Sequence, residues 1–208
     1  MYSNKITALL FFLCITVLGQ QKITVDEIFT GAFRAKGMDE LQSLQNTNQY
    51  TVLNFDRATR SMQIDLYDFA TLKKESNLID TKNFTALADG IDSYTFDASE
   101  KQLLIACNSD KIFRHSFTAD YFLYDLATKT LTKLFDFKVQ EPTFSPDGTK
   151  IAYAKGNNLY VYEIASKKSV AITSDGMKNS IINGITDWVY EEEFAFVKAF
   201  DWSKDSKK

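Results

Sequence analysis

The chain has 208 residues, a length that suits one or two domains. It carries 24 Lys and Arg against 27 Asp and Glu, a formal net charge of −3, and this mild acidity excludes the strongly basic surface of a nucleic-acid-binding protein. Hydrophobic residues make up 45% of the chain and charged residues 25%, a composition typical of globular rather than disordered proteins.

The rare residue types exclude several kinds of active site. One His and two Cys are too few for a structural zinc site, so we expect no metal and no other cofactor. No two of the glycines are two, four or five positions apart, which excludes a dinucleotide-binding fingerprint, a G-x-S-x-G nucleophile elbow and a P-loop. No motif supports a catalytic triad around His115. We therefore expect no catalytic residue in this chain.

Residues 1–19 have the pattern of a signal peptide. Lys5 provides a short positive start, and an uncharged, mostly apolar run of 14 residues extends from Ile6 to Gly19. A helix needs about 20 apolar residues to span a bilayer, so this run favours a cleaved signal peptide, with cleavage after Gly19. The sequence thus predicts a secreted or periplasmic protein. The alternative is a protein anchored in the membrane by an uncleaved leader.

Residues 20–49 are predicted to be an amino-terminal helical or linker segment. A short helix is expected from Thr24 to about Phe33. Thr24 and Glu27 have the spacing of a capping box, and acidic side chains are favourable in the first turn of a helix.

Residues 50–208 are predicted to form short β-strands. The 17 Phe and 10 Tyr favour β-rich structure. Short runs with alternating apolar side chains are separated by Asn, Asp, Gly, Ser and Lys, as turns require. The clearest such runs are Tyr50–Leu53, Leu103–Cys107, Ile151–Ala154 and Leu159–Tyr162.

A repeated turn predicts how these strands are organised. Phe144–Lys150 (F-S-P-D-G-T-K) places Pro before Asp-Gly and leads directly into a strand. Phe96–Lys101 (F-D-A-S-E-K) precedes a strand in the same way, and Trp202–Lys208 resembles a third copy that stops before its strand. The copies begin 48 and 58 positions apart, a period typical of propeller blades.

We therefore predict an all-β fold, an incomplete β-propeller of roughly three four-stranded blades. An irregular β-sandwich is the alternative. Because a propeller needs about four to eight blades to close, we expect residues 50–208 to be a truncated propeller domain.

The segment Asp187–Phe194 (D-W-V-Y-E-E-E-F) places three adjacent carboxylates between aromatic residues. Charges this close repel one another unless water or a cation offsets them. Composition alone favours a solvated acidic turn. The functional alternative is a cation clamp, in which two carboxylates hold an ammonium group by charge-assisted hydrogen bonds. In that interpretation Trp188 and Tyr190 pack so as to fix the loop.

Two motifs, in this order along the chain, resemble those of the dipeptidyl peptidase IV family, serine peptidases of the prolyl oligopeptidase type. Phe113–Tyr121 (F-R-H-S-F-T-A-D-Y) is similar to the arginine-bearing segment of that family, and Asp187–Phe194 is similar to its glutamate motif. The opening I-T-V-D-E-I-F-T-G-A-F and the F-S-P-D-G turn also resemble its amino-terminal β-propeller. The resemblance covers essentially the whole chain after the leader.

The resemblance implies a substrate-binding role for three residues. Glu192 and Glu193 would bind the free amino terminus of a peptide, and Arg114 would help to hold these glutamates and contact a substrate carbonyl. A fixed distance from this clamp to the nucleophile would limit cleavage to the bond after the second residue. His115 is expected to be structural, since the catalytic His of the family lies far downstream.

The family's catalytic Ser, Asp and His belong to a carboxy-terminal α/β-hydrolase domain that is absent from these residues. We therefore expect the amino-terminal propeller portion of a serine dipeptidyl peptidase that releases X-Pro or X-Ala dipeptides. The alternatives are a non-catalytic, propeller-type binding module and a truncated, inactive product. The expected partners are peptides with a free amino terminus, with no nucleic acid and no membrane span after leader cleavage. A homodimer of the full-length protein remains open.

Overall fold

The computed structural model describes residues 22–35 and 40–208, so the predicted signal peptide lies outside the described residues. The chain divides into two compact units, residues 1–38 and 39–208, and each is described by itself.

The first unit contains the predicted short helix. Helix α2 (Val25–Thr30) begins with the capping box, which the structure confirms, because Thr24 Oγ1 accepts a hydrogen bond from Glu27 N at 3.2 Å and Glu27 Oε2 accepts one from Thr24 N at 2.8 Å. The helix ends at Gly31, where φ is 79°. Glycine reaches this left-handed conformation without a steric penalty, so the helix is shorter than the pattern predicts.

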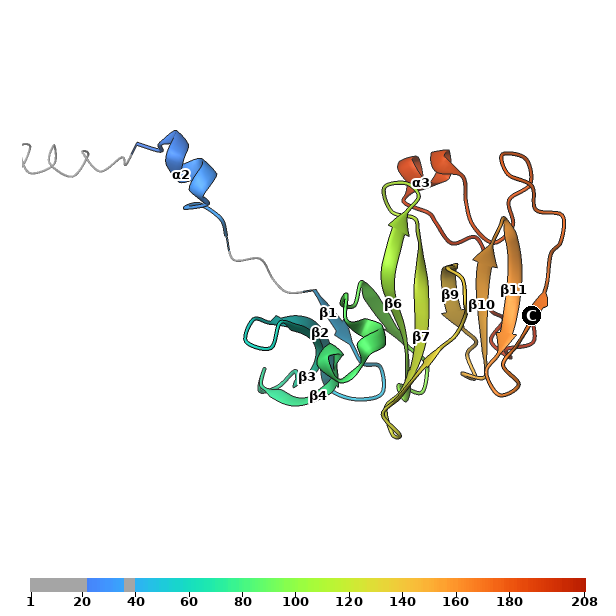
Figure 1. Cartoon of the computed structure of the whole chain (residues 1–208), viewed down its shortest axis with the longest axis horizontal. Coiled ribbons are helices and arrows are strands. Elements are labelled where there is room, and N and C mark those ends of the chain that lie inside the picture. The colour runs from blue at the N-terminus through green and yellow to red at the C-terminus, as the bar shows by residue number, and fades with distance from the viewer. Residues whose placement is uncertain (1–21, 36–39) are drawn as a thin grey trace, which may run out of the picture. The chain divides into compact units, whose positions relative to one another are not determined.

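The second unit consists mainly of three four-stranded antiparallel sheets, which confirms the predicted fold class (Figure 1). In each sheet, neighbouring strands follow one another in the chain. The first sheet contains β1 (Leu41–Ser43), β2 (Gln49–Asp56), β3 (Ser61–Asp68) and β4 (Lys74–Asp80). The second contains β5 (Ser93–Phe96), β6 (Gln102–Lys111), β7 (Phe117–Asp125) and β8 (Thr130–Lys133). The third contains β9 (Gln140–Phe144), β10 (Lys150–Lys155), β11 (Asn158–Glu163) and β12 (Lys168–Ala171).

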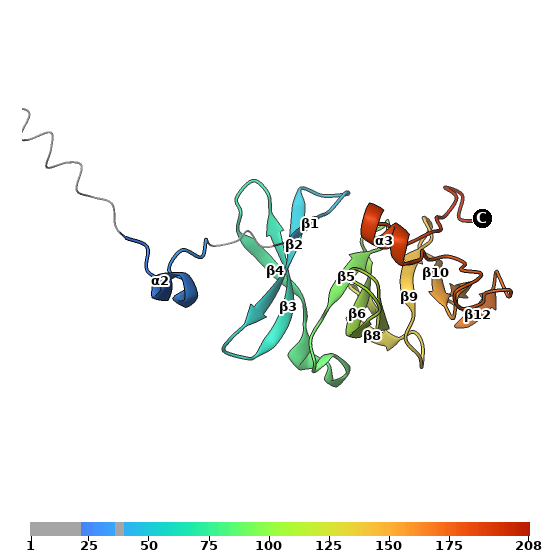
Figure 2. The same ribbon diagram turned by 90° about the horizontal axis from the view of Figure 1, so that it is seen from above.

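Short helices complete this unit. Two 3₁₀ helices, η1 (Thr81–Asn83) and η2 (Thr85–Leu87), connect the first sheet to the second, and helix α3 (Trp188–Phe194) follows the third sheet. Viewed from above, the three sheets succeed one another along the unit (Figure 2).

The first sheet begins ahead of residue 50, where the pattern predicts the first strand. β1 and Gln49 of β2 lie within the segment predicted to be helical or linker. A strand of three residues is too short to show alternation of apolar side chains. β1 is therefore recognised only by its pairing with β2, in which Leu41 lies opposite Val52.

The middle sheet is buried on both faces. In β6 every residue from Leu103 to Cys107 is at most 5% exposed, so this run is continuously apolar because neither face meets water. The core between the first and second sheets includes Ile64, Ile79, Leu103, Ile105 and Cys107. The core between the second and third sheets includes Leu104, Ala106, Ala119, Ile151 and Tyr153. Alternate residues of one strand thus join three sheets.

The repeated turns share one geometry. In residues 97–102, 145–150 and 203–208 the first N–H donates to the last carbonyl oxygen, at 3.0, 2.8 and 2.7 Å. The fourth residue of each turn is left-handed, with φ of 56° at Glu100, 70° at Gly148 and 58° at Ser206. The third copy closes in the same way without the Pro of the second.

These turns also contact one another from sheet to sheet. Asn46 N, in the first sheet's β1–β2 loop, donates to Glu100 Oε2 at 3.3 Å. A Cβ atom on Gly148 would lie 3.2 Å from Asp97 Oδ2, and Asp147 N donates to Ser206 Oγ at 3.0 Å. The turns therefore link successive sheets as well as successive strands.

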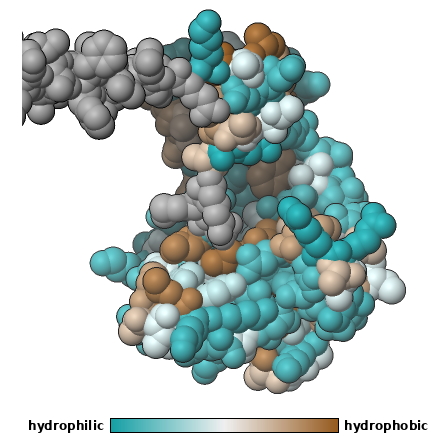
Figure 3. Space-filling view, turned by 90° about the vertical axis from the view of Figure 1, so that its left-hand side faces the viewer, coloured by the Kyte–Doolittle hydropathy of each residue, from teal (hydrophilic) through white to brown (hydrophobic). Residues whose placement is uncertain are grey.

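The surface is largely polar where Figure 3 shows it, with hydrophobic side chains in scattered patches. Within residues 22–35 and 40–208 there is no helix with the length and apolar character needed to cross a bilayer.

Asp97 offers a test of the turn geometry. Its carboxylate is buried and accepts hydrogen bonds from Lys101 N at 2.8 Å and Gln102 N at 2.7 Å. Because Asp97→Ala leaves both donors without this partner, we expect the free energy of unfolding to fall by about 1.5–3 kcal/mol in urea denaturation. The exposed Asp136 provides the control, and an equal loss in Asp136→Ala would contradict the assigned role.

Candidate functional site

The glutamate motif forms helix α3 rather than a turn. Asp187 caps the helix, because its carboxylate accepts a hydrogen bond from Tyr190 N at 3.1 Å. The helix ends at Ala195, which is left-handed with φ of 51° and donates its N–H to Glu191 O at 3.0 Å. Since a helix turns by about 100° per residue, the three consecutive glutamates point in three different directions.

Glu191 is buried and faces the arginine loop, residues 112–116, which joins β6 to β7. It is 1% exposed, and its Oε1 accepts hydrogen bonds from His115 N at 2.5 Å and Ser116 N at 2.9 Å. Burial by itself raises the pKa of Glu191, but the His115 and Ser116 N–H groups favour the charged form, and the resulting pKa is below the usual value. The interpretation of the motif as a fully solvated acidic turn is therefore wrong for this residue.

Glu192 pairs with the arginine of the same loop. Arg114 Nε lies 3.3 Å from Glu192 Oε2, and the two side chains are 70% and 18% exposed. Residues 78 positions apart in the chain thus meet at one end of the second unit, where α3 lies beside the loop at the end of β6 (Figure 1). The structure brings together two of the three predicted substrate-binding residues.

Glu193 is the exposed member of the run. With the residues that the structure describes, it forms no salt bridge. Of the three carboxylates on α3, Glu192 alone pairs with the Arg114 guanidinium among the described residues, so the helix carries excess negative charge, which favours a cation. The negative charge of α3 also acts on Glu141. The pKa of Glu141 is raised, mainly by burial and also by the charge of Glu191, while Lys198 lowers it.

The aromatic residues of α3 do not pack as expected. Trp188 is 54% exposed and Tyr190 is 53% exposed. Tyr190 contacts Phe194 one turn later, with ring centroids 5.8 Å apart, but Phe194 is itself 70% exposed. The prediction that Trp188 and Tyr190 fix the loop by packing is wrong for the described residues, because backbone hydrogen bonds to Glu191 connect the helix to the loop instead.

His115 acts through its backbone. Its N–H donates to Glu191, whereas the residue as a whole is exposed. Sequence patterns identified neither Glu191 nor Ser116 as part of the site. The sequence offered one signal for Glu191. If the E-E-E run is helical, its three side chains point in different directions, so they need not share one environment.

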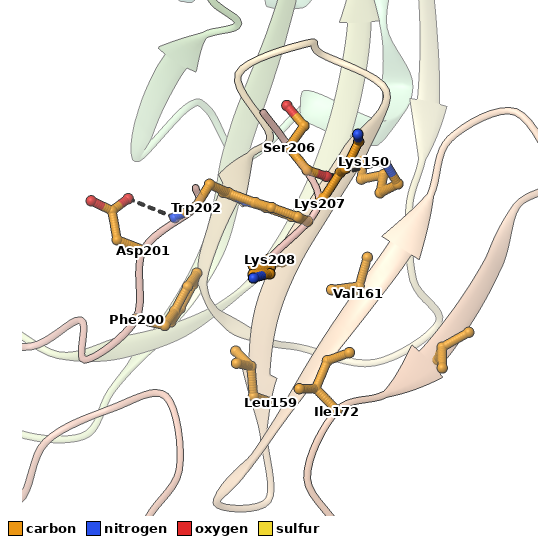
Figure 4. Close-up of a pocket in the computed structure, with 12 residues that line it drawn as sticks. Lys150, Leu159, Val161, Ile172, Phe200, Asp201, Trp202, Ser206, Lys207 and Lys208 are labelled. Atoms are coloured by element: carbon orange, nitrogen blue, oxygen red, sulfur yellow. Dashed lines mark hydrogen bonds between the residues drawn. The ribbon is translucent and has the colours of Figure 1, made fainter. Parts of the chain in front are cut away.

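Among the cavities of this unit, two differ in their position relative to the site. One, of about 560 Å³, lies beside the site and is lined in part by Phe113, Ser116, Asp187 and Trp188. The other, of about 610 Å³, lies between the outer face of the third sheet and the last residues described, and Val161, Ile172 and Trp202 are among its lining residues (Figure 4). Arg114, Glu192 and Glu193 do not line the second cavity, so it is separate from the candidate site.

The described residues offer no obvious metal centre. Within residues 22–35 and 40–208, no three His, Cys, Asp or Glu side chains are grouped as metal ligands would be.

Comparison with known proteins shows the family of this chain. Residues 97–208 match the family model for the dipeptidyl peptidase IV (DPP IV) N-terminal region. The chain is 31% identical to dipeptidyl aminopeptidase B of Saccharomyces cerevisiae over 195 residues, which cover 89% of this chain and 23% of that protein. It is 37% identical to dipeptidyl peptidase 4 of Felis catus over 131 residues, which cover 62% of this chain and 17% of that protein.

The same relationship holds among solved structures. The crystal structure of Porphyromonas gingivalis dipeptidyl peptidase 4 matches with a TM-score of 0.78 and 31% identity over 90% of this chain and 27% of that one. Fold and motifs together define the N-terminal propeller region of a peptidase. The chain belongs to the dipeptidyl peptidase IV family. It spans less than a quarter of the length of the curated relatives named above.

Asp187 tests how far the site depends on helix α3. Because Asp187→Ala removes the N-cap, we expect the helix to lose about 1 kcal/mol of local stability. Amide hydrogen exchange should then become about fivefold faster in α3 and remain unchanged in β10. Asp187→Ser retains a capping oxygen and should restore slow exchange. Equal rates in the Ala and Ser variants would contradict a capping role.

Proposed function

We propose that this chain provides the amino-terminus clamp of a dipeptidyl peptidase. Glu192 and Glu193 would bind the protonated α-amine of a peptide, and Arg114 would hold Glu192 and contact a substrate carbonyl. The observation that carries the proposal is the pairing of Glu192 with Arg114 beside the exposed Glu193.

The charges of the site support an ammonium ligand. Adjacent helix positions project about 100° apart, so the two side chains do not contact each other, and we propose that they approach an ammonium group from two sides at a point just outside the helix. An ammonium group at that point can donate a hydrogen bond to each carboxylate, and charge-assisted hydrogen bonds of this kind are among the strongest in proteins. An N-acetylated peptide offers neither the charge nor the donors.

The remaining features of the reaction rest on the family relationship. We propose that the parent protein is a serine dipeptidyl peptidase that releases X-Pro and X-Ala dipeptides, with its catalytic residues in an α/β-hydrolase domain. Proline or alanine preference would come from an apolar pocket in that domain. A homodimer of the full-length protein is part of the same proposal.

We further propose that the protein acts outside the cytoplasm, as the pattern of residues 1–19 suggests.

The clamp predicts binding that depends on a free amine. We expect the 208-residue chain to bind Ala-Pro amide at least about tenfold more tightly than N-acetyl-Ala-Pro amide in NMR titrations. Glu192→Gln and Glu193→Gln should each weaken binding of the free-amine peptide by about 10-fold or more, since a hydrogen bond to a charged group is worth about 1.5–3 kcal/mol.

Glu163, an exposed glutamate at the end of β11, provides the matched control, and Glu163→Gln should bind as the unaltered chain does. Equal binding of the acetylated and free peptides would contradict the clamp. Amine-independent binding of peptides would favour a binding module instead.

The leader predicts the mass of the exported polypeptide. Peptides from residues 21–208 should be found in the secreted or periplasmic fraction of the source, on a polypeptide whose amino terminus is Gln20. Mass spectrometry of the intact species reports this terminus directly. A species several times heavier than this chain would support the parent peptidase, whereas one that begins at Met1 would contradict cleavage.

A further inference from the structure

The three consecutive glutamates of α3 occupy three different environments. Glu191 is 1% exposed, the Glu192 side chain is 18% exposed, and Glu193 is exposed. The clamp uses the second and third of these residues. The first is turned away from solvent by the helical rotation, toward the loop that carries Arg114.

A buried carboxylate is costly unless hydrogen-bond donors replace the water that it loses. Glu191 has such donors, because one of its oxygens accepts from His115 N at 2.5 Å and Ser116 N at 2.9 Å. Both donors are backbone N–H groups, so these hydrogen bonds hold the main chain of the loop rather than a side chain. The bond therefore connects α3 to the arginine loop rigidly.

The arginine loop needs this connection. Its internal closure consists of Ile112 N and Phe113 N, which donate to Ser116 O at 2.9 and 3.4 Å. Arg114 lies at the tip of the loop, between Phe113 and Ser116. Its side chain reaches α3 through the contact of Arg114 Nε with Glu192 Oε2 at 3.3 Å. An exposed ion pair of this kind contributes little by itself, typically about 0–1 kcal/mol. The two backbone bonds to Glu191 are the stronger link between the elements.

We propose that Glu191 is a positioning residue of the clamp: by accepting the His115 and Ser116 N–H groups it fixes Arg114 against α3 and so sets the geometry in which Glu192 and Glu193 bind an amine. This inference rests on the proposed function for the amine, but the positioning of Arg114 can be measured without any ligand. Glu191 does not touch the substrate.

The ligand-free measurement is NMR of the 208-residue chain. The amide signals of His115 and Ser116 and the Arg114 Nε–H signal should all be displaced from random-coil positions in the unaltered chain. In Glu191→Gln, which preserves the shape of the side chain and one acceptor oxygen, they should move part of the way. In Glu191→Ala the Arg114 Nε–H signal should reach its random-coil position while signals from β10 stay in place. An unchanged Arg114 signal in both variants would overturn the proposal.

The second measurement separates positioning from amine binding. Glu191→Ala should weaken binding of Ala-Pro amide at least about tenfold, with a smaller loss in Glu191→Gln. Glu193→Gln should weaken it as well without moving the His115 and Ser116 amide signals. If the Glu191 variants shift those signals and leave peptide affinity unchanged, the residue serves only the fold and the positioning role is overturned.

The outcomes distinguish this inference from the proposed function. If Glu193→Gln leaves the affinity unchanged, the clamp itself fails, and the Arg114 signal still decides whether Glu191 positions the loop. If Glu191→Ala does not fold, Glu191→Gln alone decides, because its shape and acceptor oxygen suit the same cavity.

Discussion

The two buried faces of the middle sheet are the constraint on which the rest of the second unit depends. β6 presents apolar side chains to both sides, so it is stable only with a sheet against each face. Alternate residues of one strand hold the first and third sheets in place, and the repeated turns link the sheets at their ends. Hydrogen bonds add to this packing, as between Thr51 Oγ1 of β2 and Tyr94 OH of β5, which lie 2.8 Å apart.

The candidate site depends on the same hairpin. The arginine loop joins β6 to β7, whose pairing extends to Lys111 opposite Phe117 at the base of the loop. Helix α3 reaches the tip of that loop after the chain has completed the third sheet. The buried Glu191 converts this approach into a fixed contact, and it leaves Glu192 and Glu193 with the freedom to meet a ligand. A single turn of α3 thus contains one buried carboxylate and two that we propose to be functional.

Local chemistry was predictable where it acts over a few residues. The capping box of α2 and the repeated six-residue turns appear in the structure as their residue types require, and the third turn closes with Ser206 where the second has Gly148. Patterns failed where the partner is distant. β1 has three residues and exists through its pairing with β2, and the exposure of Trp188 and Tyr190 reflects which surfaces neighbouring elements cover.

The sequence by itself determined the β-rich fold class, the strand and turn periodicity, and the likeness of two motifs to one peptidase family, because each depends on residue types at short spacing. The tertiary structure alone decided which glutamate is buried and which residues meet Arg114. Residues 114 and 192 are far apart in the chain, and sequence periodicity does not predict the distance between their side chains. Their contact exists because the stacked sheets carry a loop and a later helix to the same end of the unit.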